Sequence, residues 1–188
     1  KKLGIPSYRV IGSGTVLDTA RLKSSIASHI GIDARNIHTY VLGEHGDSEV
    51  AAYSVTTIGG LMLDKYCLNC NKCCNKTLEL KTLHDEVKNA AYEIINKKKA
   101  TYYGIGLALN RIVKAILNDE NAILTVSAYL DDGKYGQSDI YIGVPAIINR
   151  TGIKELLELS LNKEDQAKLD KSCRVLKEII QNDLKDVI

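Results

Sequence analysis

Several features that mark other protein classes are missing from this chain. No apolar run approaches the roughly 20 residues that a helix needs to cross a membrane. The two lysines at the start are not followed by the apolar stretch of a secretory signal. The formal net charge is only +2, with acidic and basic residues interspersed, so no charged surface for nucleic acid is expected. We therefore expect a cytoplasmic protein without membrane or nucleic-acid partners.

Internal repeats and low-complexity tracts are also missing, and the composition is that of a globular chain. Its 188 residues, 45% of them hydrophobic, are enough to bury a sizeable core, so residues 1–188 are expected to form one domain. Apolar periodicity predicts an α+β fold, in which long helices pack on mainly antiparallel strands. The expected helices are 15–29, 77–117 with a break at 101–106, and 163–184; the expected strands are 9–11, 36–42, 122–130, 137–143 and 144–149.

Cysteine is concentrated in one segment, where four of the five stand together: Cys67, Cys70, Cys73 and Cys74. Thiolates at this spacing can converge on zinc, and the run resembles part of an iron–sulfur motif. That motif needs a fourth cysteine at a different spacing and followed by proline, whereas Asn75 follows Cys74 here, and no histidine lies in the cluster. Because no secretion signal points to an oxidising compartment, we favour free surface thiols over disulfides or a bound metal.

The strongest candidate for chemistry is the turn GEHGDSE at 43–49, which carries His45. A histidine titrates near neutral pH, and glycines admit backbone conformations that side chains forbid, so this turn can present a proton donor to a pocket. Asp18 and Arg21 stand three residues apart in an expected helix and so share one face. Taken separately, a histidine satisfied by a hydrogen bond and an ordinary ion pair on a solvated helix are the commoner interpretations. Taken together, the three residues offer a proton donor, a carboxylate to hold it and a cation for an anionic substrate.

The sequences of these segments resemble the second half of the L-lactate dehydrogenases, within the lactate/malate dehydrogenase superfamily. The resemblance covers nearly the whole chain and rests on four phrases in the family's order: RVIGSGTVLDTAR at 9–21, GEHGDSE at 43–49, ATYYGIG at 100–106 and YGQSDIYIGVP at 135–145.

The resemblance implies a reaction and three principal residues. It implies interconversion of pyruvate and L-lactate with NADH and NAD, in which the residue matching His45 gives a proton to the carbonyl oxygen. The residue matching Asp18 accepts a hydrogen bond from the other imidazole nitrogen, which favours the charged ring. The residue matching Arg21 binds the substrate carboxylate with a two-pronged guanidinium. Malate or another 2-hydroxy acid is the alternative substrate, because the loop that discriminates best in the family has no counterpart here.

Lesser roles carry over at four further positions. Ser13 matches a residue beside the nicotinamide ring, and Thr101 matches one that helps to close the substrate pocket. Lys23 and His38 match a basic pair that binds fructose 1,6-bisphosphate at a subunit interface in allosteric bacterial members. Arginine is usual where Lys23 stands, and lysine offers charge to a phosphate without the bidentate geometry. The resemblance also implies a homotetramer.

One absence then becomes informative. A dinucleotide-binding half needs a strand and a G-x-G-x-x-G turn that opens a helix. The Gly-Ser-Gly turn at 12–14 lacks the third glycine and runs into the expected helix of Asp18. The chain starts at Lys1, and its only methionine is Met62. We therefore expect the C-terminal half of a longer enzyme, without the N-terminal Rossmann domain that binds NAD and inactive on its own. The alternative interpretation is an inactive assembly module that lacks its nucleotide-binding half.

Overall fold

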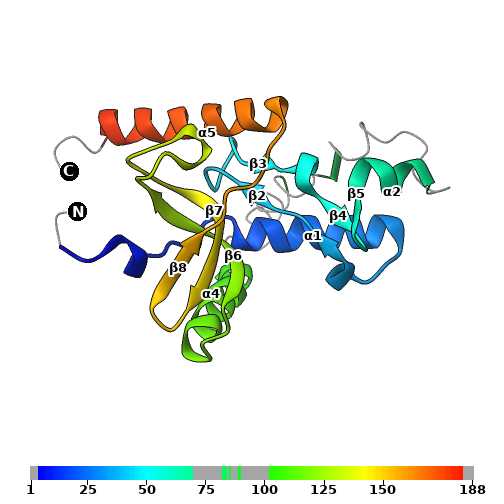
Figure 1. Ribbon diagram of the computed structural model, residues 1–188, viewed down its shortest axis with the longest axis horizontal. Helices are drawn as coiled ribbons and strands as arrows, with labels where there is room; N and C mark the ends of the chain where they lie inside the picture. Colours follow the sequence, from blue (N-terminus) through cyan, green and yellow to red (C-terminus); the bar gives the residue numbers. More distant parts are fainter. Residues whose placement is uncertain (1–3, 70–81, 84, 86–88, 90–101, 184–188) are drawn as a thin grey trace.

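The computed structural model describes residues 4–69, 82, 83, 85, 89 and 102–183 (Figure 1). Its helices are α1 (Val16–Ile30), α2 (Leu63–Asn69), α4 (Tyr102–Leu117) and α5 (Lys163–Asp183), with short 3-10 turns η1 (Ser7–Arg9), η2 (Ala34–Asn36), η3 (Tyr53–Val55) and η4 (Lys134–Gly136). Its strands are β1 (Ile37–His38), β2 (Val41–Leu42), β3 (Val50–Ala51), β4 (Thr57–Ile58), β5 (Leu61–Met62), β6 (Ala122–Leu130), β7 (Ile140–Asn149) and β8 (Gly152–Leu156). No described helix combines the length and apolar character that crossing a membrane requires.

The main sheet is antiparallel, in the order β6-β7-β8. Strands β6 and β7 pair along their whole length, from Ala122 opposite Ile148 to Leu130 opposite Ile140. Two smaller antiparallel sheets, β1-β4-β5 and the β2-β3 hairpin, complete the strands of the described part. The expected antiparallel pairing is therefore found, and Figure 1 shows α4 and α5 against the main sheet.

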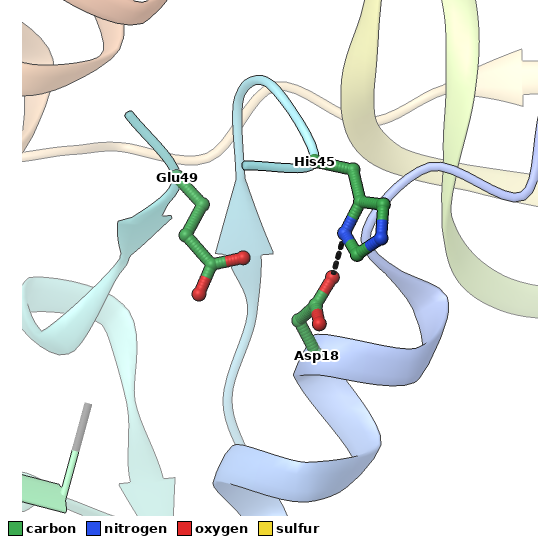
Figure 2. A group of neighbouring side chains, drawn as sticks. All are labelled: Asp18, His45 and Glu49. Carbon is green, nitrogen blue, oxygen red and sulfur yellow. Dashed lines mark hydrogen bonds and ion pairs between the residues drawn. The ribbon is translucent and has the colours of Figure 1, made fainter. Parts of the chain in front are cut away.

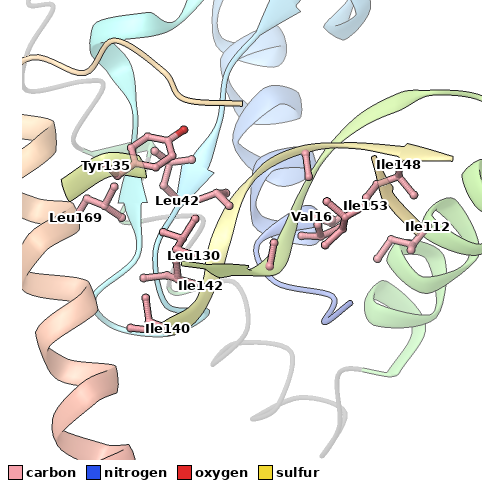
Figure 3. Close-up of a cluster of buried hydrophobic side chains, with 14 of the residues drawn as sticks. Val16, Leu42, Ile112, Leu130, Tyr135, Ile140, Ile142, Ile148, Ile153 and Leu169 are labelled. Carbon is pink, nitrogen blue, oxygen red and sulfur yellow. The ribbon is translucent and has the colours of Figure 1, made fainter. Parts of the chain in front are cut away.

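Two hydrophobic cores are joined by helix α1. The larger core lies between the main sheet, α4, α5 and the start of α1, and includes Val16, Ile142 and Leu169 (Figure 3). The smaller core packs the rest of α1, including Leu22 and Ile26, against the short strands and α2. Burying one such aliphatic side chain contributes roughly 1.5–3 kcal/mol relative to exposure. The first turns of α1 are thus fixed where the two cores meet.

The ends of the helices follow the sequence signals. Helix α1 ends at Gly31, which adopts a left-handed conformation with φ of 72° and donates its N–H to the carbonyl of Ala27. Helix α5 begins after Asn162, whose side-chain oxygen accepts a hydrogen bond of 2.8 Å from the backbone N–H of Asp165. Both helices lie within two residues of the expected bounds.

The strand predictions need three corrections. The expected strand 36–42 is two strands in different sheets, because the chain changes partner at Thr39, whose hydroxyl bonds that of Thr56. The expected strands 137–143 and 144–149 are one strand, β7, with Pro145 inside it. Proline is tolerated there because its nitrogen faces the end of the β8 ladder, where its carbonyl accepts from the N–H of Leu157. The expected strand 9–11 is replaced by η1 and a single bridge between Gly12 and Ser127.

The long expected helix 77–117 is described only in part. Helix α4 runs without interruption from Tyr102, so the break predicted at 101–106 does not occur within 102–106. Residues 82, 83, 85 and 89 are helical, and strand β8 was not predicted. Thr101 and the cysteines at 70, 73 and 74 lie outside the described residues, as do side-chain details of Cys67.

Candidate active site

His45 projects from the turn of the β2-β3 hairpin towards the first turn of α1 (Figure 2). Its Nδ1 lies 2.7 Å from Oδ2 of Asp18. The Asp18 side chain is only 4% exposed, whereas that of His45 is 54% exposed. One ring nitrogen therefore faces a buried carboxylate, and the other is left for a second partner.

Arg21 shares the same carboxylate from one helical turn further along. Its Nη1 lies 3.6 Å from Oδ1 of Asp18, so the two oxygens of Asp18 face two different side chains. The guanidinium also lies against α4, where a Cβ on Gly104 would be 3.6 Å from Nη2 of Arg21 and 3.2 Å from Leu17. Because a buried carboxylate is costly unless it is paired, His45 and Arg21 together compensate the charge of Asp18.

Glu49 adds a second carboxylate to this group. It is 7% exposed, and potential ligand atoms of Asp18, His45 and Glu49 all lie within 4.8 Å of one another. Among the described residues these three side chains form the one set that could hold a metal ion. A metal on Nδ1 would have to displace the hydrogen bond to Asp18, so this geometry fits a paired histidine better.

The surroundings of His45 favour its charged form. The hydrogen bond to Asp18 is the largest influence and raises the pKa of His45 above its ordinary value of 6.5. The negative charges of Asp18 and Glu49 also raise this pKa, while partial burial and the positive charge of Arg21 lower it. The pKa of His45 is therefore raised above 6.5, which favours the charged imidazole.

A ring of hydroxyls holds the helix of Asp18 against the strand that leads to His45. We call it the threonine ring: Thr15, Thr19, Thr125 and the backbone of Val41. Thr15 donates to the carbonyl of Val41, whose N–H donates to Thr19 at 2.9 Å. The hydroxyls of Thr19 and Thr125 lie 2.8 Å apart, and Thr125 donates back to the carbonyl of Thr15 at 3.1 Å. Each buried hydroxyl has a partner, so the ring fixes α1 relative to β2 and β6.

A pair of glycines docks the histidine turn on the main sheet. Gly43 and Gly143 exchange two backbone hydrogen bonds of 2.9 Å. A Cβ on Gly143 would lie 2.7 Å from the carbonyl oxygen of Gly43, which leaves no room for a side chain. The sheet thus approaches the hairpin backbone directly, immediately before the residues that carry His45.

The other residues singled out from the sequence lie elsewhere. Ser13 is half-buried in the turn just before α1. Lys23 lies on α1, where its charge contributes to lowering the pKa of Asp33, and His38 is exposed on β1, which packs on α1.

The structure adds residues that the sequence did not single out. Glu49 stands at the end of the GEHGDSE segment, but the sequence alone assigns it no role, because its burial depends on the assembled fold. Thr125 is 110 residues from Thr15, and no local pattern predicts such a contact.

Comparison with known proteins defines the class of domain. The family described as "lactate/malate dehydrogenase, alpha/beta C-terminal domain" matches residues 15–187. The chain belongs to this lactate/malate dehydrogenase family. It is similar to L-lactate dehydrogenase 1 of Clostridium acetobutylicum, with 51% identity over 97% of this chain and 58% of that protein. It is also similar to L-lactate dehydrogenase 1 of Listeria monocytogenes, with 49% identity over 98% of this chain and 57% of that protein.

Solved structures agree with this assignment. The minor L-lactate dehydrogenase from Enterococcus mundtii, in its ligands-bound form, superposes with a TM-score of 0.89 at 49% identity, over 95% of this chain and 56% of that one. The chain thus spans little more than half the length of these relatives, and the expected α+β fold is confirmed.

Proposed function

We propose that this chain provides the proton-transfer and substrate-carboxylate sites for the interconversion of pyruvate and L-lactate with NADH and NAD. The observation that carries the proposal is the shared carboxylate of Asp18, which bonds His45 through one oxygen and faces Arg21 with the other. In this proposal residues 1–188 act as one substrate-binding and catalytic domain. The reaction is the cytoplasmic reduction of glycolytic pyruvate to lactate by a homotetramer.

The pair of Asp18 and His45 sets which atom of the ring carries the mobile proton. With Nδ1–H donated to Asp18, the charged ring presents Nε2–H on its exposed side. The keto oxygen of pyruvate accepts that proton as its carbon is reduced, and the neutral Nε2 takes the hydroxyl proton of lactate in the reverse direction. Asp18 stabilises the charged ring in both directions.

Arg21 orients the substrate in this scheme. Its guanidinium offers two parallel N–H donors, which match the two oxygens of the pyruvate carboxylate. Binding at Arg21 places the adjacent keto group towards His45, because both side chains converge on Asp18. From the family resemblance we propose that Thr101, which lies outside the described residues, helps to close the substrate pocket.

Few of the described residues can be assigned to binding the cofactor. When bound, NADH supplies a hydride to the carbonyl carbon. The Gly-Ser-Gly turn does not fit its phosphates, because a Cβ on Gly14 would lie 2.4 Å from the backbone nitrogen of Ser127, which shows that this turn is packed on β6. We propose only that Ser13 contacts the nicotinamide ring, and that the portion of the relatives unmatched by this chain holds the rest. Lys23 and His38 are proposed to bind fructose 1,6-bisphosphate.

The test compares substrates and one substitution in the complete enzyme. We expect pyruvate to be turned over in preference to oxaloacetate, and His45→Gln to lower turnover by about 10²–10⁴-fold, the usual contribution of a general acid. His29→Gln, at an exposed position near the end of α1, is the matched control and should keep wild-type rates. Near-normal turnover in His45→Gln would refute the proton-donor role. A preference for oxaloacetate would instead favour malate dehydrogenase.

A further inference from the structure

The histidine turn touches the C-terminal helix through one buried hydroxyl. Ser172 on α5 is 0% exposed, and its Oγ accepts a hydrogen bond of 2.8 Å from the backbone N–H of Glu44. The same Oγ lies 3.0 Å from Oγ of Ser48, and Ser48 donates to the carboxylate of Glu44. We call Ser172, Ser48 and Glu44 the hydroxyl relay.

The donors and acceptors of the hydroxyl relay allow one arrangement. Ser48 uses its only hydrogen on the Glu44 carboxylate, so Ser172 must donate to Ser48. Ser172 in turn accepts from the N–H of Glu44. The relay therefore starts at the backbone of Glu44 and ends at its side chain, and every hydroxyl donates once and accepts once. Such closed networks polarise their members and hold one geometry.

The glycines on either side of His45 fit the same network. Gly43 has φ of +95°, and a Cβ there would lie 2.6 Å from Oγ of Ser172. A Cβ on Gly46 would lie 3.0 Å from Oε1 of Glu44. The two glycines leave space for the hydroxyl relay, so the backbone on both sides of His45 is shaped around it.

Helix α5 is itself well anchored on the rest of the molecule. Its buried Asp165 accepts from the backbone N–H of Ser54 at 3.0 Å, and Leu169 is fully buried in the larger core. An attachment at Ser172 therefore connects the histidine turn to a fixed element. Because the ring of His45 is half exposed, packing alone does not orient it, and its hydrogen bond to Asp18 depends on where the backbone of the turn lies.

We propose that Ser172 is a positioning residue that holds the turn so that His45 stays on Asp18. This inference rests on the proposed function only in taking His45 as the proton donor. Without the Ser172 hydroxyl, the N–H of Glu44 loses its partner inside the protein, and the turn loses its link to α5. The imidazole then spends time away from the carboxylate.

The test measures His45 directly, by NMR titration of ¹⁵N-labelled histidines in the 188-residue chain, with His45→Gln to assign the signal. In Ser172→Ala we expect the pKa of His45 to fall towards its ordinary value of 6.5. The charged groups that face His45, namely Asp18, Arg21 and Glu49, are unchanged in this variant. In the complete enzyme the same variant should lower kcat by about tenfold and change KM less, since misplacement of the acid affects the chemical step.

Two further variants separate positioning from general loosening of α5. Cys173→Ala removes one buried atom from the neighbouring residue of the same helix and should leave the pKa of His45 raised. Ser48→Ala opens the hydroxyl relay without altering a residue of α5. Because the hydrogen bond that the N–H of Glu44 donates to Ser172 is retained, this variant should lower the pKa by a smaller amount. An unchanged pKa in both Ser172→Ala and Ser48→Ala, or equal shifts in Ser172→Ala and Cys173→Ala, would overturn the proposal. Turnover of His45→Gln tests the proposed function separately, because the titration needs no activity.

Discussion

The buried side chain of Asp18 positions two more exposed side chains, those of His45 and Arg21. Its two oxygens face His45 and Arg21, so a single carboxylate sets the spacing between the proposed proton donor and the proposed carboxylate-binding cation. Because Asp18 is held in the first turn of α1, where both hydrophobic cores meet, it has little freedom to move. The precision of the candidate site therefore originates in the most buried of its members.

The raised pKa of His45 predicts how stability depends on pH. A group whose pKa is higher in the folded than in the unfolded chain contributes fully below its unfolded pKa, near 6.5 here, and loses that contribution as pH rises through the folded pKa. The melting temperature of the wild type should therefore exceed that of His45→Gln most at mildly acidic pH. The difference should shrink as pH rises from about 6.5 through the higher pKa that His45 has in the folded chain.

Thermal unfolding of both proteins across this range checks the expectation. The difference in melting temperature should be small, because His45 is half exposed and solvent screens its interaction with Asp18. His38→Gln, at an exposed position on β1, serves as the control and should run parallel to the wild type. A difference between wild type and His45→Gln that grows with pH would contradict the assigned direction.

At the scale of single residues, the sequence predicts part of the candidate site. Asp18 and Arg21 could be placed on one face from their spacing alone, and the structure brings both to His45. Glu49 and Ser172 could not be placed, because burial of the first and the 128-residue separation of the second from Glu44 depend on the assembled fold. Local periodicity carries no information about which distant hydroxyl meets a turn.

Among the elements, α5 is the one whose start can be tested most simply. Asn162 caps its first turn through the backbone N–H of Asp165, and loss of such a cap costs about 1 kcal/mol. We expect Asn162→Ala to lower the free energy of unfolding by this amount in urea denaturation. Lys163→Ala, at the exposed first residue of the helix, should have a far smaller effect. Equal losses in the two variants would argue against a capping role.

Helices were more predictable than strands for a physical reason. The bounds of α1 and α5 follow from caps and periodicity within one segment. Strands need partners, and the exchange of partner at Thr39 depends on Thr56, which lies in another part of the chain. Pro145 indicated a strand edge, yet β7 continues through it, because β8 ends just where the missing N–H would be needed.

At the scale of the whole molecule, the described residues include the proposed proton donor His45, whereas the Gly-Ser-Gly turn before α1 is packed on β6 and does not fit the phosphates of NADH. The chain matches 58% of the Clostridium acetobutylicum protein and 56% of the Enterococcus mundtii structure. We expect the 188-residue chain to fold but neither to bind NADH tightly nor to turn over pyruvate, because bringing cofactor and acid together is a large part of catalysis.

Fluorescence titration with NADH and a pyruvate assay would check this expectation, with circular dichroism to establish folding and a complete relative as positive control. Measurable turnover by the purified chain would show that its residues are sufficient. It would also remove the interpretation of the chain as an inactive assembly module.

The threonine ring has a consequence for how the candidate site forms during folding. Thr15, Thr19 and Val41 can meet early, since fewer than 30 residues separate them. Thr125 must arrive from more than 100 residues away, and long-range contacts of this kind are the slow ones in folding. We therefore expect the hydrogen bond between Asp18 and His45 to form stably only once β6 has joined the sheet. The protonation of this imidazole should then report that the native topology is complete.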